Sequence, residues 1–166
     1  SIVQRLQGHG NDIFTPTLVN YLRSDEFLQH NQPLYLKRSR NLKRSSRGRV
    51  YDLQELYEEL LSEGHVCEVP YINFTWTTKP NYKRVGYTSV VFRVVAVSSA
   101  LDSEDMPRDV AKFVLFHELL HHEQEIMTKD NHDADFRMRE MSYPGFWECQ
   151  CRLIQFYTAS KNMRRM

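Results

Sequence analysis

A chain of 166 residues, 41% apolar and 26% charged, has the length and composition of one globular domain with a substantial core. This composition excludes a disordered protein, and no apolar run is long enough to cross a bilayer. The formal net charge is only +1, yet the positive charges are unevenly distributed along the chain.

The first part of the chain predicts two helices joined by a basic connection. Leucine and aromatic residues at helical spacing predict a helix over residues 16–28. Residues 37–49 are basic and rich in serine, which is typical of an irregular connection. Apolar residues recur at helical spacing from Asp52, and Glu63-Gly64 marks the end of this second helix.

The middle of the chain predicts three strands. Residues 72–78 alternate apolar and polar side chains and are β-branched or aromatic at most positions. Residues 85–100 hold a dense run of valine and aromatic residues, which predicts two strands with a break near Thr88-Ser89. We expect the three strands to form a small, mostly antiparallel sheet.

The last part of the chain is predicted to be helical. Pro107 suits the first turn of a helix that we expect to continue to Thr128, apolar on nearly all sides as in a buried helix. Three features follow: a break at residues 129–131, a short helix over 134–141 and a last helix over 146–160. We therefore predict one α+β domain over residues 1–166, with the sheet packed on the long helix and with flanking helices.

The three cysteines, Cys67, Cys149 and Cys151, include no C-x-x-C pair. An odd number at this spacing is typical neither of a disulfide framework nor of a thiolate zinc site. We therefore expect reduced cysteines and a cytoplasmic protein, because disulfides are rare in that compartment.

An H-E-x-x-H sequence, from His117 to His121, lies inside the long apolar helix. Four residues turn a helix by about 400° and rise about 6 Å, so the two histidines point the same way and can bind one zinc ion. Glu118 lies about 100° around the helix, where it can act as general base toward a water on the ion. Burying two histidines and a carboxylate would be costly without such a metal.

A catalytic zinc usually has three protein ligands and one open position. The candidates for the third ligand are His122, His132 and Glu140. His122 points about 100° away from His121, which indicates a surface or supporting role. His132 follows the break in the chain, and a reversal there would bring its ring back over the motif, so we favour His132 over Glu140.

These residues resemble the SprT-like metallopeptidase domains and the related YgjP-like proteins. The likeness covers residues 72–140, under half of the chain. It is carried by Val85-Gly86-Tyr87, residues 93–98, Leu101-Asp102, residues 114–121, and a histidine followed four residues later by an aromatic, His132 and Phe136.

The resemblance implies a minimal zincin: a helix, a three-stranded sheet, the active-site helix and a ligand-bearing helix. It also implies His132 as the third ligand and a substrate peptide that adds as a strand to an exposed sheet edge. The eukaryotic DNA-repair members carry a cysteine-rich zinc ribbon after this domain, and this sequence contains none.

Seven positive charges lie within thirteen residues of the basic connection: Lys37, Arg38, Arg40, Lys43, Arg44, Arg47 and Arg49. Since the whole chain carries +1 and this segment carries +7, the remainder carries −6. One interpretation is a solvated loop, neutralised by Glu58, Glu59 and Glu63. The other is a contact with the phosphate backbone of a nucleic acid, without base stacking because no aromatic is interleaved.

We expect a zinc metallopeptidase that hydrolyses a peptide or protein substrate with Glu118 as general base. Tyr87, Tyr143 and Arg137 are candidate donors to the oxyanion. Two rival hypotheses remain. One is a zinc hydrolase acting on a phosphoanhydride or small amide, and the other is a nucleic-acid-associated module with non-catalytic zinc.

Overall fold

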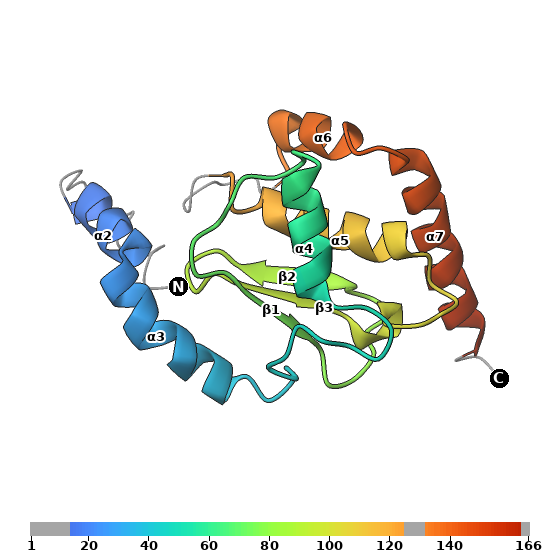
Figure 1. The fold of residues 1–166 in the computed structure, drawn as a ribbon, viewed down its shortest axis with the longest axis horizontal. Coiled ribbons are helices and arrows are strands. Elements are labelled where there is room, and N and C mark those ends of the chain that lie inside the picture. The colour runs from blue at the N-terminus through green and yellow to red at the C-terminus, as the bar shows by residue number, and fades with distance from the viewer. Residues whose placement is uncertain (1–13, 125–131, 164–166) are drawn as a thin grey trace.

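A computed structural model describes residues 14–124 and 132–163 (Figure 1). The elements in chain order are α2 (Phe14–Arg23), α3 (Asp25–Arg38), α4 (Leu53–Ser62), β1 (Asn73–Trp76), β2 (Gly86–Ser89), β3 (Val94–Val97), a 3₁₀ turn (Ser99–Leu101), α5 (Arg108–Leu120), α6 (Ala134–Met141) and α7 (Phe146–Met163). Over these residues the fold is α+β, with six α-helices and one three-stranded sheet, as the sequence predicts.

The sheet is mixed, where the sequence indicated a mostly antiparallel one. Its order is β1-β3-β2, with β1 parallel and β2 antiparallel to β3. The chain leaves β1, passes to the far side of the sheet to form β2, and returns as β3 between the other two. The β2–β3 turn occupies residues 90–93, just after the predicted break at Thr88-Ser89.

The central strand β3 is buried on both faces, and all four of its residues are fully inaccessible. Val95 and Val97 belong to the main core with α4 and α5. Val94 and Ala96 face the opposite side, where α3 covers the sheet through Tyr35 and Leu36. Figure 1 shows α4 and α5 over one side of the sheet, α6 and α7 beyond α5, and the α2–α3 pair on the other side. A strand covered on both faces explains the unbroken apolar run.

The N-terminal segment forms two helices, where the sequence predicted one helix over residues 16–28. Ser24 separates them and caps α3, because its Oγ accepts a hydrogen bond from the Phe27 N–H at 3.1 Å. Helix α3 continues to Arg38, so the basic connection predicted over residues 37–49 begins inside a helix. Packing of Tyr35 on the sheet extends α3 through a stretch that lacks an amphipathic pattern.

Residues 41–46 cover the outer edge of β1. The Lys43 N–H donates to the Trp76 carbonyl and the Thr78 N–H donates to the Asn41 carbonyl, each at 2.8 Å. The Arg44 N–H donates to Thr75 Oγ1 at 2.9 Å. The outer edge of β2 has no backbone partner among the described residues, and it is therefore the open edge of the sheet.

The motif helix α5 ends at Leu120. His121 caps it with φ −62° and ψ −23°, so the helical spacing from His117 is preserved. Tight turns continue to Gln124, with His122 N–H donating to the Leu119 carbonyl at 2.9 Å. The predicted end at Thr128 and the predicted break at residues 129–131 lie outside the described residues.

Helices α6 and α7 match the predicted helices over residues 134–141 and 146–160. Helix α7 packs on α5, and its Cys149 and Leu153 lie in the main core. Within residues 14–124 and 132–163, no helix combines the length and the apolar character needed to span a bilayer.

Candidate metal centre

Helix α5 carries two candidate ligands and the candidate general base. Ten of its residues are buried, because the helix packs against the sheet, α4, α6 and α7. The rings of His117 and His121 lie 5.4 Å apart between centroids, one turn from each other on the same face. Buried packing of the helix therefore places both imidazoles at one surface position.

His132 joins them from the start of α6. Its Nε2 lies 3.3 Å from Nε2 of His117, and its ring centroid lies 5.0 Å from that of His121. Asp133 caps α6 by accepting from the Phe136 N–H at 2.8 Å, and Arg137 Nε donates to the His132 carbonyl at 3.1 Å. One ligand nitrogen of each histidine lies within 4.8 Å of the others, so the three could hold a metal ion.

Phe136 packs against all three histidine rings. Its ring centroid lies 5.1 Å from His117, 4.7 Å from His121 and 4.8 Å from His132. Phe136 is buried, so it supports the three imidazoles and excludes water from the side on which it packs. In the sequence, Phe136 stood out only as the aromatic four residues after His132. Its contacts with the two α5 histidines come from the tertiary structure.

Glu140, the alternative third ligand, orients His117 instead. Its Oε1 accepts a hydrogen bond from His117 Nδ1 at 2.7 Å. This bond leaves Nε2 of His117 free for an ion, which is the usual arrangement of a carboxylate behind a metal-binding histidine. Gln124 Oε1 is within hydrogen-bond distance of His121 Nδ1, at 3.2 Å, in the corresponding position behind that ring. Nothing in the sequence pattern pointed to Gln124, because it acts from a turn and not from a helix face.

His122 points away from the other histidines, as its place on the helix predicts. Its Nε2 lies 2.8 Å from Thr88 Oγ1 on β2. This contact ties the turn after α5 to the open edge strand. Burial lowers the pKa of His122 to about 4.

Glu118 is buried against β2, with 6% of its surface exposed. A Cβ added at Gly86 would lie 2.6 Å from its Oε1, so the absence of a side chain there makes room for the carboxylate. No described residue donates a hydrogen bond to this carboxylate. Burial raises the pKa of Glu118 to about 7, against the smaller opposing charges of His117 and Arg84.

The protonation states suit metal binding. Burial lowers the pKa of His121 to about 4, so its imidazole is neutral at pH 7 and a nitrogen lone pair is available. Near neutral pH, Glu118 is close to its own pKa, which is the condition for accepting and returning a proton.

The three candidate oxyanion donors have other roles in the fold. Tyr87 lies on the sheet face opposite α5, and its hydroxyl accepts from Asn41 Nδ2 at 2.9 Å. Tyr143 is buried among the rings of Phe113 and Phe116. Arg137 donates to the His132 carbonyl. The first two are therefore part of the packing, and the third supports a ligand.

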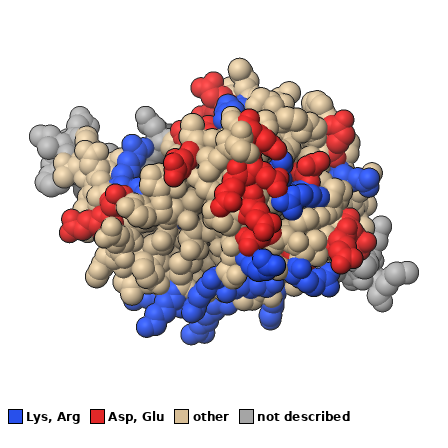
Figure 2. All heavy atoms as spheres, viewed as in Figure 1, with Lys and Arg blue, Asp and Glu red and all other residues tan. Residues whose placement is uncertain are grey.

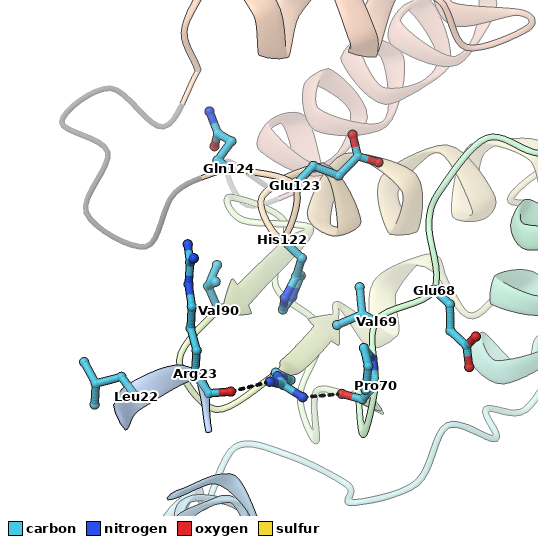
Figure 3. Close-up of a pocket in the computed structure, with 10 residues that line it drawn as sticks. Leu22, Arg23, Glu68, Val69, Pro70, Val90, His122, Glu123 and Gln124 are labelled. Atoms are coloured by element: carbon cyan, nitrogen blue, oxygen red, sulfur yellow. Dashed lines mark hydrogen bonds between the residues drawn. The ribbon is translucent and has the colours of Figure 1, made fainter. Parts of the chain in front are cut away.

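A pocket of about 370 Å³ adjoins the metal centre past the end of β2. Figure 3 shows His122 reaching into it from the turn after α5, while the carboxylates of Glu68 and Glu123 point away. Arg93 closes its floor by donating to the carbonyls of Pro70 at 2.8 Å and Arg23 at 2.9 Å. Val69, Pro70 and Val90 line the pocket, so it lies at the end of the sheet where β1 begins and β2 ends.

Together these features define a candidate metal centre of three histidines, with a buried carboxylate on the residue after His117. Three imidazoles fit a divalent transition metal and leave a coordination position open. A buried carboxylate that accepts no hydrogen bond from the described residues would suit a water bound to such an ion. Comparison with protein-family models, with curated proteins and with solved structures finds no match to this chain.

We predict that the metal-free protein loses stability as pH rises from about 4.5 to about 7, through Glu118. Its folded-state pKa is raised, so the native state binds more protons than the unfolded state in that window. The loss is on the order of 3 kcal/mol and is absent in Glu118→Gln. The buried histidines act in the opposite sense, because their lowered pKa values favour folding at higher pH.

The measurement is urea unfolding of both metal-free proteins at pH 5 and pH 8. The difference between them isolates Glu118, since the histidines are the same in each. Equal pH dependence in both proteins would show that the carboxylate is solvated in the native state.

Proposed function

We propose that this protein is a zinc-dependent metallopeptidase. The observation that carries the proposal is the convergence of His117, His121 and His132 beside the buried carboxylate of Glu118. Three imidazoles with an open position are the donor set of a catalytic zinc. Copper and nickel bind such ligands more tightly, so the choice of zinc rests on availability in cells.

In this mechanism the chain's own residues position the reactants and move the proton. Zinc, when bound, supplies a Lewis acid for the carbonyl and lowers the pKa of water. Glu118 takes one proton from the attacking water at a carboxylate oxygen, while the water oxygen bonds to the carbonyl carbon. The carbon–nitrogen bond then breaks, and Glu118 returns the proton to the leaving nitrogen. Glu140 and Phe136 keep His117 in place throughout.

A peptide substrate is favoured over a phosphoanhydride because an open strand lies beside the candidate base. Just before β2, the Val85 carbonyl accepts a hydrogen bond from the Ser98 N–H at 2.7 Å. The alternate residues Gly86 and Thr88 therefore direct their backbone groups outward. An extended peptide can pair with these groups as an added strand. Gly86 also contacts Glu118, so a peptide bound there lies next to the base.

Incubation of the zinc-loaded protein with a reduced, alkylated protein substrate tests the proposal. Mass spectrometry should find fragments that are absent when zinc is removed by a chelator and that return when zinc is added. The opposite result is that the zinc-loaded protein leaves unfolded proteins intact and hydrolyses a phosphoanhydride or a small amide. That result would support the rival hypothesis of a zinc hydrolase with a non-peptide substrate.

We propose nucleic-acid binding through the basic connection as a second function. All seven of its lysine and arginine side chains are exposed, and none forms an ion pair within the described residues. Glu59 and Glu63 pair with Arg108 and Lys112 and so do not neutralise it. Figure 2 shows lysine and arginine side chains along the lower edge of the molecule, where Figure 1 draws this segment.

Asp102 keeps the end of this segment in a defined conformation. Its carboxylate accepts the backbone N–H groups of Arg49, Val50 and Tyr51 at 2.6 to 3.1 Å. Burial alone would raise the pKa of Asp102, but these donors and the charge of Lys43 hold it below its usual value. An ordered row of unpaired cations suits a phosphate backbone better than a loop neutralised by its neighbours.

The triple variant Arg40→Gln, Lys43→Gln, Arg47→Gln should bind duplex DNA more weakly. Each lost phosphate contact reduces the slope of log affinity against log salt by about 0.9, so the slope should fall by roughly 3. Fluorescence anisotropy between 50 and 200 mM salt measures this slope. The control is Arg152→Gln, an exposed arginine on α7. An unchanged slope in the triple variant would leave the segment as a solvated connection.

We also propose a reducing, cytoplasmic location. All three cysteines are free thiols, and Cys149 is buried in the core. Intracellular compartments keep such thiols reduced.

A further inference from the structure

Helix α7 carries apolar side chains on two opposite sides. Cys149 and Leu153 are buried in the main core, on the side that packs against α5. Trp147 and Ile154 are seven residues apart, so about two turns of helix place them on one common side. Residue 149 is rotated by about 200° from residue 147, so this second side points away from the core. We call it the outer face of α7.

The outer face is apolar and accessible. Trp147 is 67% exposed and Ile154 is 60% exposed. Cys151, one turn after Trp147, is an exposed free thiol between them. In Figure 1, α7 forms one end of the molecule, opposite the end formed by α2 and α3. Grouped apolar side chains at a surface mark interaction sites, and tryptophan is enriched at the centres of such sites.

Glu148 and Arg152 border the outer face on one flank. Both are exposed, and they lie about 100° and 140° around the helix from Trp147. Neither forms an ion pair in the part of the chain that the structure describes. One carboxylate and one guanidinium make this flank neutral. It therefore lacks the basic cluster that an anionic membrane or a nucleic acid attracts.

The outer face is complementary to itself. When two α7 helices pack antiparallel about a twofold axis near residues 150 and 151, Trp147 lies about 5 Å before the axis and Ile154 about 5 Å after it. Trp147 of each copy then meets Ile154 of the partner subunit. The same axis keeps both charged flanks on one side, so that Glu148 meets Arg152 of the partner subunit. A twofold interface requires this kind of self-complementarity.

We propose that two copies of this chain form a dimer through the outer faces of α7, packed antiparallel about a twofold axis. The two contacts between Trp147 and Ile154 form the apolar centre, and the two pairs of Glu148 with Arg152 lie at the rim. One pair of helix faces buries less than the roughly 1,200 Å² below which interfaces are weak and transient. We therefore expect a dissociation constant of about 1–100 μM.

Sedimentation equilibrium of the zinc-loaded protein between about 1 and 200 μM measures this association. Trp147→Ala should weaken the dimer by about 10- to 100-fold, because the twofold axis makes one substitution remove two central contacts. The control is Leu34→Ala, since Leu34 is 42% exposed on α3 at the other end of the molecule. A monomer throughout this range, or equal association of Trp147→Ala and wild type, overturns the proposal.

Charge reversal distinguishes a second copy from any other partner. Arg152→Glu places like charges opposite each other at two points and should weaken the dimer by about 3- to 10-fold at low salt. Adding Glu148→Arg restores both pairs with their signs exchanged, and the double variant should associate almost as the wild type does. A folded double variant that stays as weak as Arg152→Glu overturns the antiparallel arrangement.

Trp147 also reports the contact directly. The chain has two tryptophans and Trp76 is fully buried, so acrylamide quenching of fluorescence follows Trp147. Quenching should decrease as the protein concentration rises through the dissociation constant. A short bismaleimide should link the two Cys151 thiols near the axis in wild type and in Cys67→Ser, and not in Cys151→Ser. A monomer whose Trp147 is shielded only by phosphatidylcholine–phosphatidylserine vesicles overturns the proposal and assigns the outer face to a lipid surface.

Discussion

Replacing Glu118 with glutamine is expected to abolish hydrolysis while zinc remains bound. Glutamine keeps the shape of the side chain against Gly86 but cannot accept a proton. General-base catalysis contributes roughly 10²–10⁴-fold, so kcat/KM should fall by at least that factor with little change in KM. Because Glu118 accepts no hydrogen bond from the described residues, the neutral amide should not disturb the fold.

The measurement combines fragment formation with the zinc content of the same samples. Glu123→Gln is the matched control, because Glu123 lies on the following turn and pairs with Arg139 at 3.2 Å. It should keep near-normal activity. Full activity in Glu118→Gln would refute the proposed mechanism, whereas loss of both zinc and activity would give Glu118 a role in holding the ion.

Removing the imidazole of His132 should cause the largest loss of metal affinity of any single change outside α5. A four-ligand zinc site gains about 10–16 kcal/mol on binding, so one ligand is worth about 3–4 kcal/mol. His132→Ala should therefore weaken zinc binding by roughly 10²–10³-fold. Glu140→Gln removes only the partner of His117 Nδ1 and should weaken binding by about 10- to 100-fold.

Competition with a chromophoric zinc chelator at pH 7.5 measures both affinities. His30→Ala, an exposed histidine on α3, is the control and should bind zinc as the wild type does. If Glu140→Gln lost more affinity than His132→Ala, the carboxylate and not the imidazole would be the third ligand.

The two candidate ligands on α5 could be predicted from the sequence, because their shared position depends only on helical periodicity. His117 and His121 share a helix face because they are four residues apart, and this holds wherever the helix packs. Their burial followed from the apolar residues around them. The same reasoning found β3, whose run of valines requires cover on both faces.

Contacts between distant segments required the tertiary structure. Glu140 and Gln124 orient two histidines through hydrogen bonds that no spacing rule predicts. The position of Gly86 against Glu118 depends on the order of the strands in the sheet. The sheet is mixed because β3 lies between β1 and β2 and runs parallel to one and antiparallel to the other. The sequence favoured His132 over Glu140 as the third candidate ligand, and only the tertiary structure showed their positions: His132 Nε2 lies 3.3 Å from Nε2 of His117, and Glu140 lies against its Nδ1.

By itself, the sequence determined the α+β class, most of the helices and strands, and the residues with the capacity to bind a metal. Helical and strand periods are local properties, set by side chains within a few residues of one another. Only the tertiary structure decided that residues 41–46 cover β1, that β2 is the open edge, and that Gly86 on this edge strand lies against Glu118. These pairings are set by burial and hydrogen bonding between segments far apart in the chain, and local patterns carry no information about which segments will meet.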